Sequence, residues 1–319
     1  MGWGATKRGF VAAVLAASVV LTAGPSWSAD RNAGAGHKDR AGQEERAGRD
    51  GRTRHPRRGP APGDGAPARF VAESGGRIVI VSAETGRIDR RLTADQPGGG
   101  AEDPTVSPDG RTVWFSRGDG ECAAHIASVP LSGGGEVALP GSGEAGPEGL
   151  PLPRPGRAQL AYSRTDCNQA DHAVVVGDVK GLEGHGQLGL LPLAWNRAGD
   201  RLLAVTPDGA TVHQLGIDVD GSIIDDTVVG PADRSADCRL RVVAFSPDDN
   251  DGYVAERRCG PDGAEGRRSL VLLDRTGAYR QTVIRLHRGQ DFADRLAFDP
   301  SGHSLLYSTT DGAGSGATL

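Results

Sequence analysis

Aromatic and apolar side chains are scarce in this chain of 319 residues. Aromatic residues make up 4% of it and hydrophobic residues 37%, which is too little for a membrane protein but enough for one core with many turns. The apolar residues show no helical periodicity, and 49 glycines and 20 prolines are spread along the whole length. Because glycine and proline interrupt helices, this composition excludes a coiled coil or a helical bundle.

Positive charge is scarce in the part of the chain that can fold. Lysine occurs only at Lys7, Lys38 and Lys180. The net charge of the whole chain is −5, and it becomes −10 from Arg69 onward once the +2 of residues 1–29 and the +3 of residues 30–68 are removed. Binding to nucleic acid requires a positive face for the phosphates, so we expect no nucleic-acid partner.

An apolar run long enough to make a comfortable transmembrane helix is also absent. Lys7 and Arg8 precede an uncharged run rich in Ala, Val and Leu, residues 9–24, which falls short of the roughly 20 residues that span a bilayer. Small residues follow at Ser28 and Ala29. This layout predicts a signal peptide over residues 1–29 and a secreted or cell-envelope protein with no transmembrane span after signal removal. The Sec route, the twin-arginine route and an uncleaved anchor stay open as alternatives.

Residues 30–68 are predicted to be a disordered linker. The segment contains no aromatic residue and no Val, Ile or Leu, while Arg, Gly, Ala and Pro dominate it. Such a segment cannot bury enough apolar surface to offset the entropy lost on ordering. The first residues able to pack are Phe70 and Val71, so we place the start of the folded domain at residue 69.

The rest of the chain repeats one layout, in which an apolar strand, a tight turn and a second apolar strand follow one another. A further hairpin follows each of the first four units. The five units are residues 105–116, 154–163, 193–205, 243–255 and 296–307, and their turns recur at intervals of 43 to 52 residues. A period of this length with four short strands per unit is typical of a β-propeller. We therefore predict an all-β propeller of four-stranded blades over residues 69–319.

The two ends of this region predict how the ring closes. The fifth unit stops after its second strand, and a spare hairpin, residues 77–92, lies at the N-terminal end. We expect these N- and C-terminal strands to pair in one blade, because that pairing would close the ring and cover exposed sheet edges. On this count the propeller has five blades, and six is the alternative.

The repeat also resembles a known family. The Ser-Pro-Asp-Gly-Arg-x-Val-x-Phe-Ser pattern of residues 107–116 is similar to the repeat of TolB-like propellers, which are related in architecture to WD-repeat proteins. Partial matches to this pattern occur at residues 245–248 and 298–302, so the resemblance covers about residues 70–312. It implies the fold and says little about activity, because the same blades occur in proteases, sugar lyases and extracellular binding proteins.

Four cysteines in an exported chain suggest two disulfide bonds. Cys238 precedes the first strand of the fourth unit and Cys259 follows its second strand, so the two ends of this hairpin should bring them together. Cys122 and Cys167 occupy matching loops of the first two units, and they pair by elimination. A zinc site is the alternative, but the Cys-x-x-Cys spacing that it requires is absent.

Other chemical signals in the sequence are weak. Residues 218–221 and 248–252 look like fragments of a calcium loop, but neither continues to the terminal Glu of the full pattern, and Asp, Asn and Gly are also what β-turns require. The histidines form no metal-binding pair, and the sequence contains no Gly-x-Ser-x-Gly nucleophile motif. We therefore predict no metal, no cofactor and no catalytic residues.

Ligands of propellers generally bind over the central channel, where the loops that enter first strands meet the loops that leave second strands. The residues expected on that surface carry mixed charges, and they are Glu102, Asp103, Arg117, Arg241, Asp294 and Arg295. We predict a monomeric, non-catalytic scaffold that binds a protein or a cell-envelope polymer there. The alternative is a glycan-active hydrolase or lyase that uses channel carboxylates such as Asp103 and Asp294.

Overall fold

The structure of the chain is a computed structural model that describes residues 18–20, 69–95, 99–120, 122–167, 171–229, 238–246, 252–259, 267–286, 290–298, 305–311 and 317–318. The regular secondary structure of these residues consists of β-strands. None of the described segments forms a helix with the length and apolarity needed to cross a membrane. The predicted linker and most of the predicted signal peptide lie outside the described residues.

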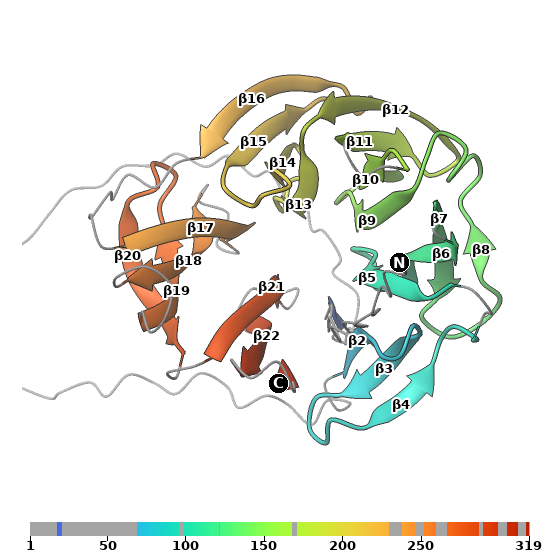
Figure 1. Cartoon of the computed structure of the whole chain (residues 1–319), viewed down its shortest axis with the longest axis horizontal. Helices are drawn as coiled ribbons and strands as arrows, with labels where there is room; N and C mark the ends of the chain where they lie inside the picture. The colour runs from blue at the N-terminus through green and yellow to red at the C-terminus, as the bar shows by residue number, and fades with distance from the viewer. Residues whose placement is uncertain are drawn as a thin grey trace, which may run out of the picture.

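The strands form antiparallel sheets arranged in a ring, and each sheet is one blade of a β-propeller (Figure 1). Blade 1 consists of β1 (Ser18–Val20), β2 (Arg69–Glu73), β3 (Ile78–Ser82) and β4 (Ile88–Arg91). Blade 2 consists of β5 (Ala101–Val106), β6 (Thr112–Gly120), β7 (Ala123–Pro130) and β8 (Val137–Ala138). Blade 3 consists of β9 (Glu148–Pro153), β10 (Gln159–Thr165), β11 (His172–Asp178) and β12 (Gly181–Leu188).

The second half of the ring follows the same plan. Blade 4 consists of β13 (Leu191–Trp195), β14 (Arg201–Val205), β15 (Val212–Ile217) and β16 (Ile223–Val229). Blade 5 consists of β17 (Cys238–Phe245), β18 (Tyr253–Cys259), β19 (Arg267–Leu273) and β20 (Tyr279–Arg285). A three-stranded sheet of β21 (Gln290–Phe298), β22 (Leu305–Asp311) and β23 (Ala317–Thr318) completes the series. The predicted all-β propeller is confirmed, and five four-stranded blades occur among the described residues.

The repeated turns form as their sequence predicts. In the turn that joins β5 to β6, the amide of Gly110 donates to the carbonyl of Ser107 at 2.8 Å, and Asp109 accepts the amide of Arg111 at 3.1 Å. Gly110 has a φ of 69°, a conformation that glycine adopts without a steric penalty. The hydroxyl of Ser107 and the amide of Arg111 lower the pKa of Asp109 because they stabilise its carboxylate.

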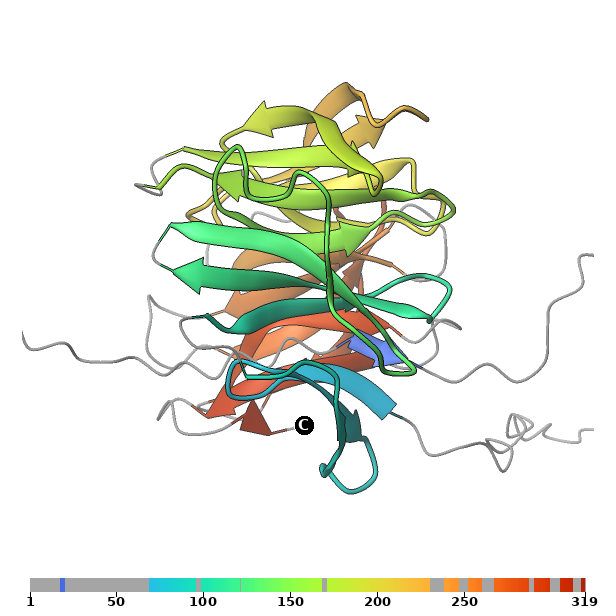
Figure 2. The ribbon, with the colours of Figure 1, turned by 90° about the vertical axis from the view of Figure 1, so that its right-hand side faces the viewer.

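Apolar clusters between neighbouring blades form the core, and Figure 2 shows the blades stacked side by side around the ring. Between blades 1 and 2, for example, Val71 and Ile78 pack against Val113 and Phe115, and all four side chains are fully buried. Similar clusters join blades 2 and 3, blades 3 and 4, and blades 4 and 5. Because each strand places alternate side chains on its two faces, one blade supplies half of two successive clusters.

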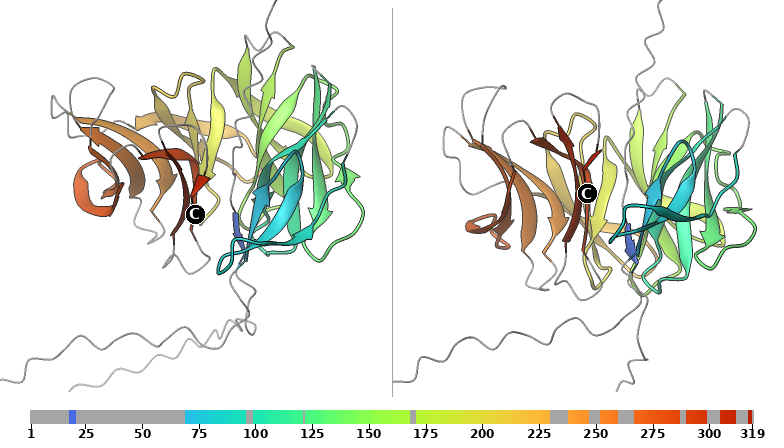
Figure 3. Two further views of the ribbon diagram at one scale, coloured as in Figure 1. Left: turned by 60° about the horizontal axis from the view of Figure 1, so that its bottom comes forward. Right: turned by 90° about the horizontal axis from the view of Figure 1, so that it is seen from below.

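The predicted closure of the ring is wrong. Strand β2 pairs with β1 and β3, and β3 pairs with β4, whereas β21 pairs with β22, and β22 with β23, in a separate sheet. The two ends therefore contribute two sheets instead of one composite blade, and Figure 3 shows β21 and β22 between blade 5 and blade 1. The physical reason is β1, which occupies the innermost position of blade 1 and contacts both β5 and β21.

Candidate functional site

The inner strands share a feature that shapes the wall around the centre of the ring. Each of β5, β9, β13, β17 and β21 has a break in its pairing with the second strand of its sheet. In β5 and β9 the additional residue produces a bulge, and Asp103 and Leu150 take left-handed φ values of 53° and 54° at matching positions. Bulges bend a strand and redirect a side chain, and they are frequent beside binding sites. The bulge in β5 thus sets the direction of Asp103.

Two of the predicted site residues, Glu102 and Asp103, belong to a cluster of carboxylates that includes Glu73 at the end of β2. We call the end of the blades where β5 begins and β2 ends the entry end of the ring. Burial, together with the negative charges of Glu102 and Asp103, raises the pKa of Glu73 to about 7, against a smaller opposite effect of the Gly76 amide. Near neutral pH, the carboxyl group of Glu73 is therefore partly protonated, and it lies beside two other carboxyl groups.

Two glycines bring blades 1 and 2 together at this cluster. The amide of Ala101 donates to the carbonyl of Gly76 at 2.8 Å. A Cβ atom added to Gly100 would lie 3.3 Å from the Cα of Gly76, so a larger residue would push these two backbone segments apart. The close approach of β2 and β5 is what places Glu73 next to Glu102 and Asp103.

We expect the Glu73→Gln variant to gain stability relative to the natural chain as the pH rises. Because the folded pKa is raised, the stabilising effect of protonated Glu73 is complete below its ordinary pKa of 4.5 and is lost as the pH rises through about 7. Since Glu73 is only partly buried, solvent screening limits the expected gain at pH 8 to about 1 kcal/mol. Urea denaturation of both proteins at pH 5 and pH 8 measures it. A constant difference between the two proteins at both pH values would contradict the raised pKa.

Arg117 has a structural role and is not exposed for ligand binding. It lies on β6 with its side chain 1% exposed, and its guanidinium pairs with Glu136. The guanidinium also stands 5.3 Å from the centre of the Phe115 ring. Its Nη1 has no hydrogen-bond partner among the described residues. Sequence reasoning placed Arg117 correctly at the entry end but could not show that it points into the protein.

Arg241 is also held in an ion pair. It lies directly across from Glu256 in the pairing of β17 with β18, and its Nη2 is 3.2 Å from a Glu256 oxygen. Glu256 is 1% exposed and also pairs with Arg258 at 2.7 Å. Arg241 therefore neutralises a buried carboxylate. The backbones of Asp294 and Arg295 lie in the widest pairing break, between Phe292 and Leu296 of β21, while their side chains lie outside the described part of the structure.

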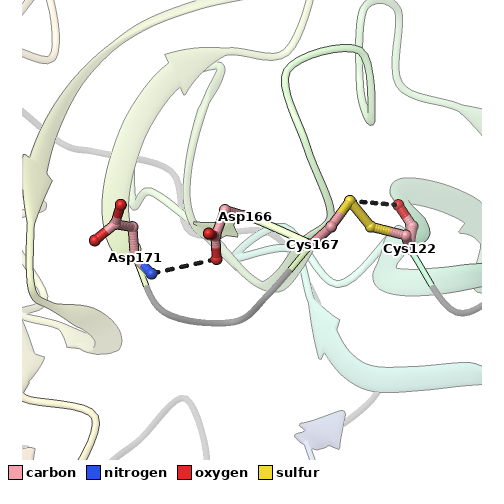
Figure 4. The surroundings of a disulfide bond; sticks show 4 residues. All are labelled: Cys122, Asp166, Cys167 and Asp171. Atoms are coloured by element: carbon pink, nitrogen blue, oxygen red, sulfur yellow. Dashed lines mark hydrogen bonds between the residues drawn. A yellow bond between two sulfur atoms is a disulfide. The ribbon is translucent and has the colours of Figure 1, made fainter.

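The predicted disulfide between Cys122 and Cys167 is present, with Cα atoms 5.2 Å apart (Figure 4). It joins the loop after β6 to the loop after β10 and so links blades 2 and 3 at the entry end. Next to it, the carboxylate of Asp166 accepts the amide of Asp171 at 3.2 Å. Cys259 is disulfide-bonded, and Cys238 lies directly opposite it in the ladder. The side chain of Cys238 lies outside the described residues, so its pairing stays a prediction.

The first calcium candidate serves as a turn. In residues 218–221, the amide of Gly221 donates to the carbonyl of Asp218 at 3.1 Å, and Asp220 accepts the amide of Ser222 at 2.8 Å. Backbone and hydroxyl donors of Ser222 lower the pKa of Asp220 because they stabilise its carboxylate. No group of three acidic, His or Cys side chains suited to a metal occurs in the described part of the chain. Most of the second candidate, residues 248–252, lies outside it.

Sequence reasoning missed Glu73 as part of the site. The sequence does mark this position, because Glu73 stands at the end of an apolar strand directly before a Ser-Gly-Gly turn. Such a residue belongs to a loop that leaves the second strand of a blade, and those loops meet the first strands of the next blade. The association with Glu102 still required the spatial order of blades 1 and 2, which the mistaken closure had obscured.

Comparison with known proteins defines the class of fold. No family model matches the chain, and no curated protein matches it significantly. Among solved structures, putative TolB from Agrobacterium tumefaciens superposes with a TM-score of 0.50 at 16% identity, covering 75% of this chain and 86% of the other. TolB from Acinetobacter baumannii gives 0.49 at 9% identity, covering 75% and 57%. The Cps50 (Swd1) propeller domain of Myceliophteria thermophila gives 0.44 at 15% identity, covering 76% and 90%.

The chain thus has a β-propeller fold similar to that of putative TolB from Agrobacterium tumefaciens, as its repeat indicated. At 16% identity the similarity concerns the fold alone.

Proposed function

We propose that this chain is an exported, non-catalytic propeller scaffold that binds a protein or a cell-envelope polymer at the entry end of the ring. The observation that carries the proposal is the carboxylate cluster of Glu73, Glu102 and Asp103. Asp103 lies in the bulge of β5, and burial together with the negative charges of Glu102 and Asp103 raises the pKa of Glu73. Concentrated negative charge at one end of an acidic domain favours a ligand with amine or guanidinium groups.

Two features support export. The N-terminal segment has the layout of a signal peptide, and the bond between Cys122 and Cys167 is of a kind that persists in oxidising compartments. A cell-envelope location places the acidic entry end among basic proteins and amine-bearing polymers. N-terminal sequencing of exported material tests this part, and we expect it to begin near Ala29 or Asp30.

The binding proposal predicts a loss of capture when the cluster is neutralised. We expect the double variant Glu102→Gln and Asp103→Asn to retain at most about one tenth of the wild-type affinity for a lysine-rich probe peptide, because two unit charges are removed from the site. Fluorescence titration at low and moderate salt measures this effect. The same variant should retain less envelope material in a pull-down run beside the wild type.

A matched control removes two carboxylates elsewhere. Glu84 and Asp225 are exposed and lie outside the entry end, so the variant Glu84→Gln with Asp225→Asn carries the same net charge as the test variant. We expect it to bind like the wild type. Equal losses in both double variants would mean that net charge, and not the cluster, governs binding, and the proposal would then fail.

One observation favours the enzyme alternative. A carboxyl group with a raised pKa beside other carboxyl groups is the arrangement of a general acid and its partner in glycoside hydrolases. A glycan-active enzyme would release reducing sugars from envelope glycans and would lose that activity on Glu73→Gln substitution. We expect no release by the wild type, and a release that Glu73→Gln abolishes would replace the scaffold proposal.

A further inference from the structure

The innermost strand of blade 1 comes from a distant part of the chain. Strand β1 pairs antiparallel with β2, with Ser18 opposite Val71 and Val20 opposite Arg69. In the other four-stranded blades, the strands follow one another directly in the sequence. Residues 21–68, between β1 and β2, lie outside the described residues. Blade 1 is therefore completed by a segment that is separated from the rest of the blade.

Strand β2 has the composition of an interior strand. Phe70, Val71 and Ala72 are at most 2% exposed. Val71 packs in the cluster between blades 1 and 2, while Phe70 and Ala72 pack in a second cluster with Val79 and Val81. An edge strand is usually protected by charge, proline or a bulge, and the apolar middle of β2 has none of these. This strand is built to be paired on both sides.

Strand β1 also closes the ring. It contacts β5 of blade 2 and β21 of the three-stranded sheet, so it fills the space at the inner end of blade 1. Yet residues 18–20 fall within the predicted signal peptide. Removal of that peptide would leave the inner edge of β2 with unpaired backbone amides and carbonyls, which is a template for another strand.

We propose that the inner edge of β2 is a strand-acceptor site, held by residues 18–20 in the precursor and taken by an extended segment of a partner protein after export. The mode of recognition is strand addition, in which the backbone supplies affinity and alternate side chains supply specificity. The proposal goes beyond the function proposed above, because backbone pairing with β2 and charge attraction at the entry end can each occur without the other.

The structure specifies the chemistry of the donor strand. It must run antiparallel to β2 and carry small or β-branched residues opposite Phe70 and Val71, as β1 does with Val19 opposite Phe70 and Ser18 opposite Val71. Continuing the register by two residues places one donor side chain opposite Glu73. Glu73 interacts there with the negative charges of Glu102 and Asp103. The donor residue opposite Glu73 is therefore expected to be lysine or arginine.

The test uses the full chain with a specific protease site inserted in residues 30–68. After folding and cleavage, the N-terminal fragment is held only by pairing with β2. The probe is a labelled peptide of residues 14–22 carrying Ala16→Lys, which places lysine opposite Glu73. Its control carries an additional Val19→Pro substitution, which removes a backbone donor and disfavours pairing.

We expect the lysine peptide to displace the fragment and to bind at least about tenfold more tightly than the proline control. In the Glu73→Gln variant, the lysine peptide should lose part of its higher affinity relative to the unsubstituted peptide of residues 14–22. The affinity of the unsubstituted peptide should stay unchanged. Equal binding of the lysine and proline peptides would overturn the proposal. So would failure of the peptide to exchange, or occupation of the edge by the C-terminal segment of the chain, which hydrogen exchange at β2 would reveal.

The unsubstituted peptide also separates this proposal from the first. The variant Glu102→Gln with Asp103→Asn keeps the backbone of β2 intact, so it should bind that peptide like the wild type even if it no longer captures envelope material. If instead capture persists and the peptide does not bind, only the strand-acceptor proposal fails.

Discussion

Replacement of Arg154 by methionine is expected to lower the free energy of unfolding by about 3 kcal/mol or more, because several buried acceptors lose their donor at once. Arg154 is 3% exposed and joins blade 3 to blade 4. Its guanidinium donates to the carbonyls of Gly199 at 2.5 Å, Asp218 at 2.7 Å and Ile217 at 3.0 Å. It also lies 5.2 Å from the centre of the Trp195 ring. Methionine keeps much of the volume but satisfies none of these carbonyls.

Thermal and urea denaturation of Arg154→Met measure this effect. The matched control is Arg157→Ala, because Arg157 lies three residues further in the same loop but is exposed. That control should stay within about 0.5 kcal/mol of the wild type. A loss below 1 kcal/mol for Arg154→Met would mean that water or rearranged donors satisfy the carbonyls and that blades 3 and 4 do not depend on this contact.

Loss of the bond between Cys122 and Cys167 is expected to cost a comparable amount. The two cysteines are separated by 45 residues, and closing a loop of that length stabilises a folded chain by about 4 kcal/mol in the chain-entropy model. The bond also joins blade 2 to blade 3 at the entry end. The double variant Cys122→Ser with Cys167→Ser should therefore unfold at a lower denaturant concentration than the wild type.

Reducing conditions provide the control for this experiment. Dithiothreitol should bring the wild type to the stability of the double variant or below it, since reduction also opens the second predicted disulfide. Non-reducing peptide mapping should recover Cys122 linked to Cys167, and Cys238 linked to Cys259. Unchanged stability of the double variant, or recovery of Cys122 linked to Cys259, would contradict the assigned roles of these bonds.

The blades could be predicted from the sequence because their signals are local. The turn at residues 107–110 uses a serine, an aspartate and a glycine at fixed positions, and the structure forms the hydrogen bonds that this order requires. Apolar strands on both sides of such turns recur at the period of a propeller. The pairing of Cys122 with Cys167, which occupy matching loops, could likewise be predicted, by elimination, from the hairpin that brings Cys238 and Cys259 together.

The site was predicted only in part, because the direction of a side chain depends on its neighbours in space. Glu102 and Asp103 lie beside Glu73, whereas Arg117 and Arg241 form ion pairs with Glu136 and Glu256. Those partners lie at sequence distances that no local pattern marks. Glu73 entered the cluster because Gly76 and Gly100 approach closely, and this contact joins two separate blades.

The all-β class, the repeat and the turns follow from local sequence, since each depends on residues within one hairpin. How the ring closes depends on the packing of strands that are far apart in the chain. The sheet containing β2 and the sheet containing β21 could have been one blade or two, and the choice depends on which strand lies beside β2. Strand pairing at an edge is governed by backbone groups that every sequence carries, so the partner is selected by geometry and packing.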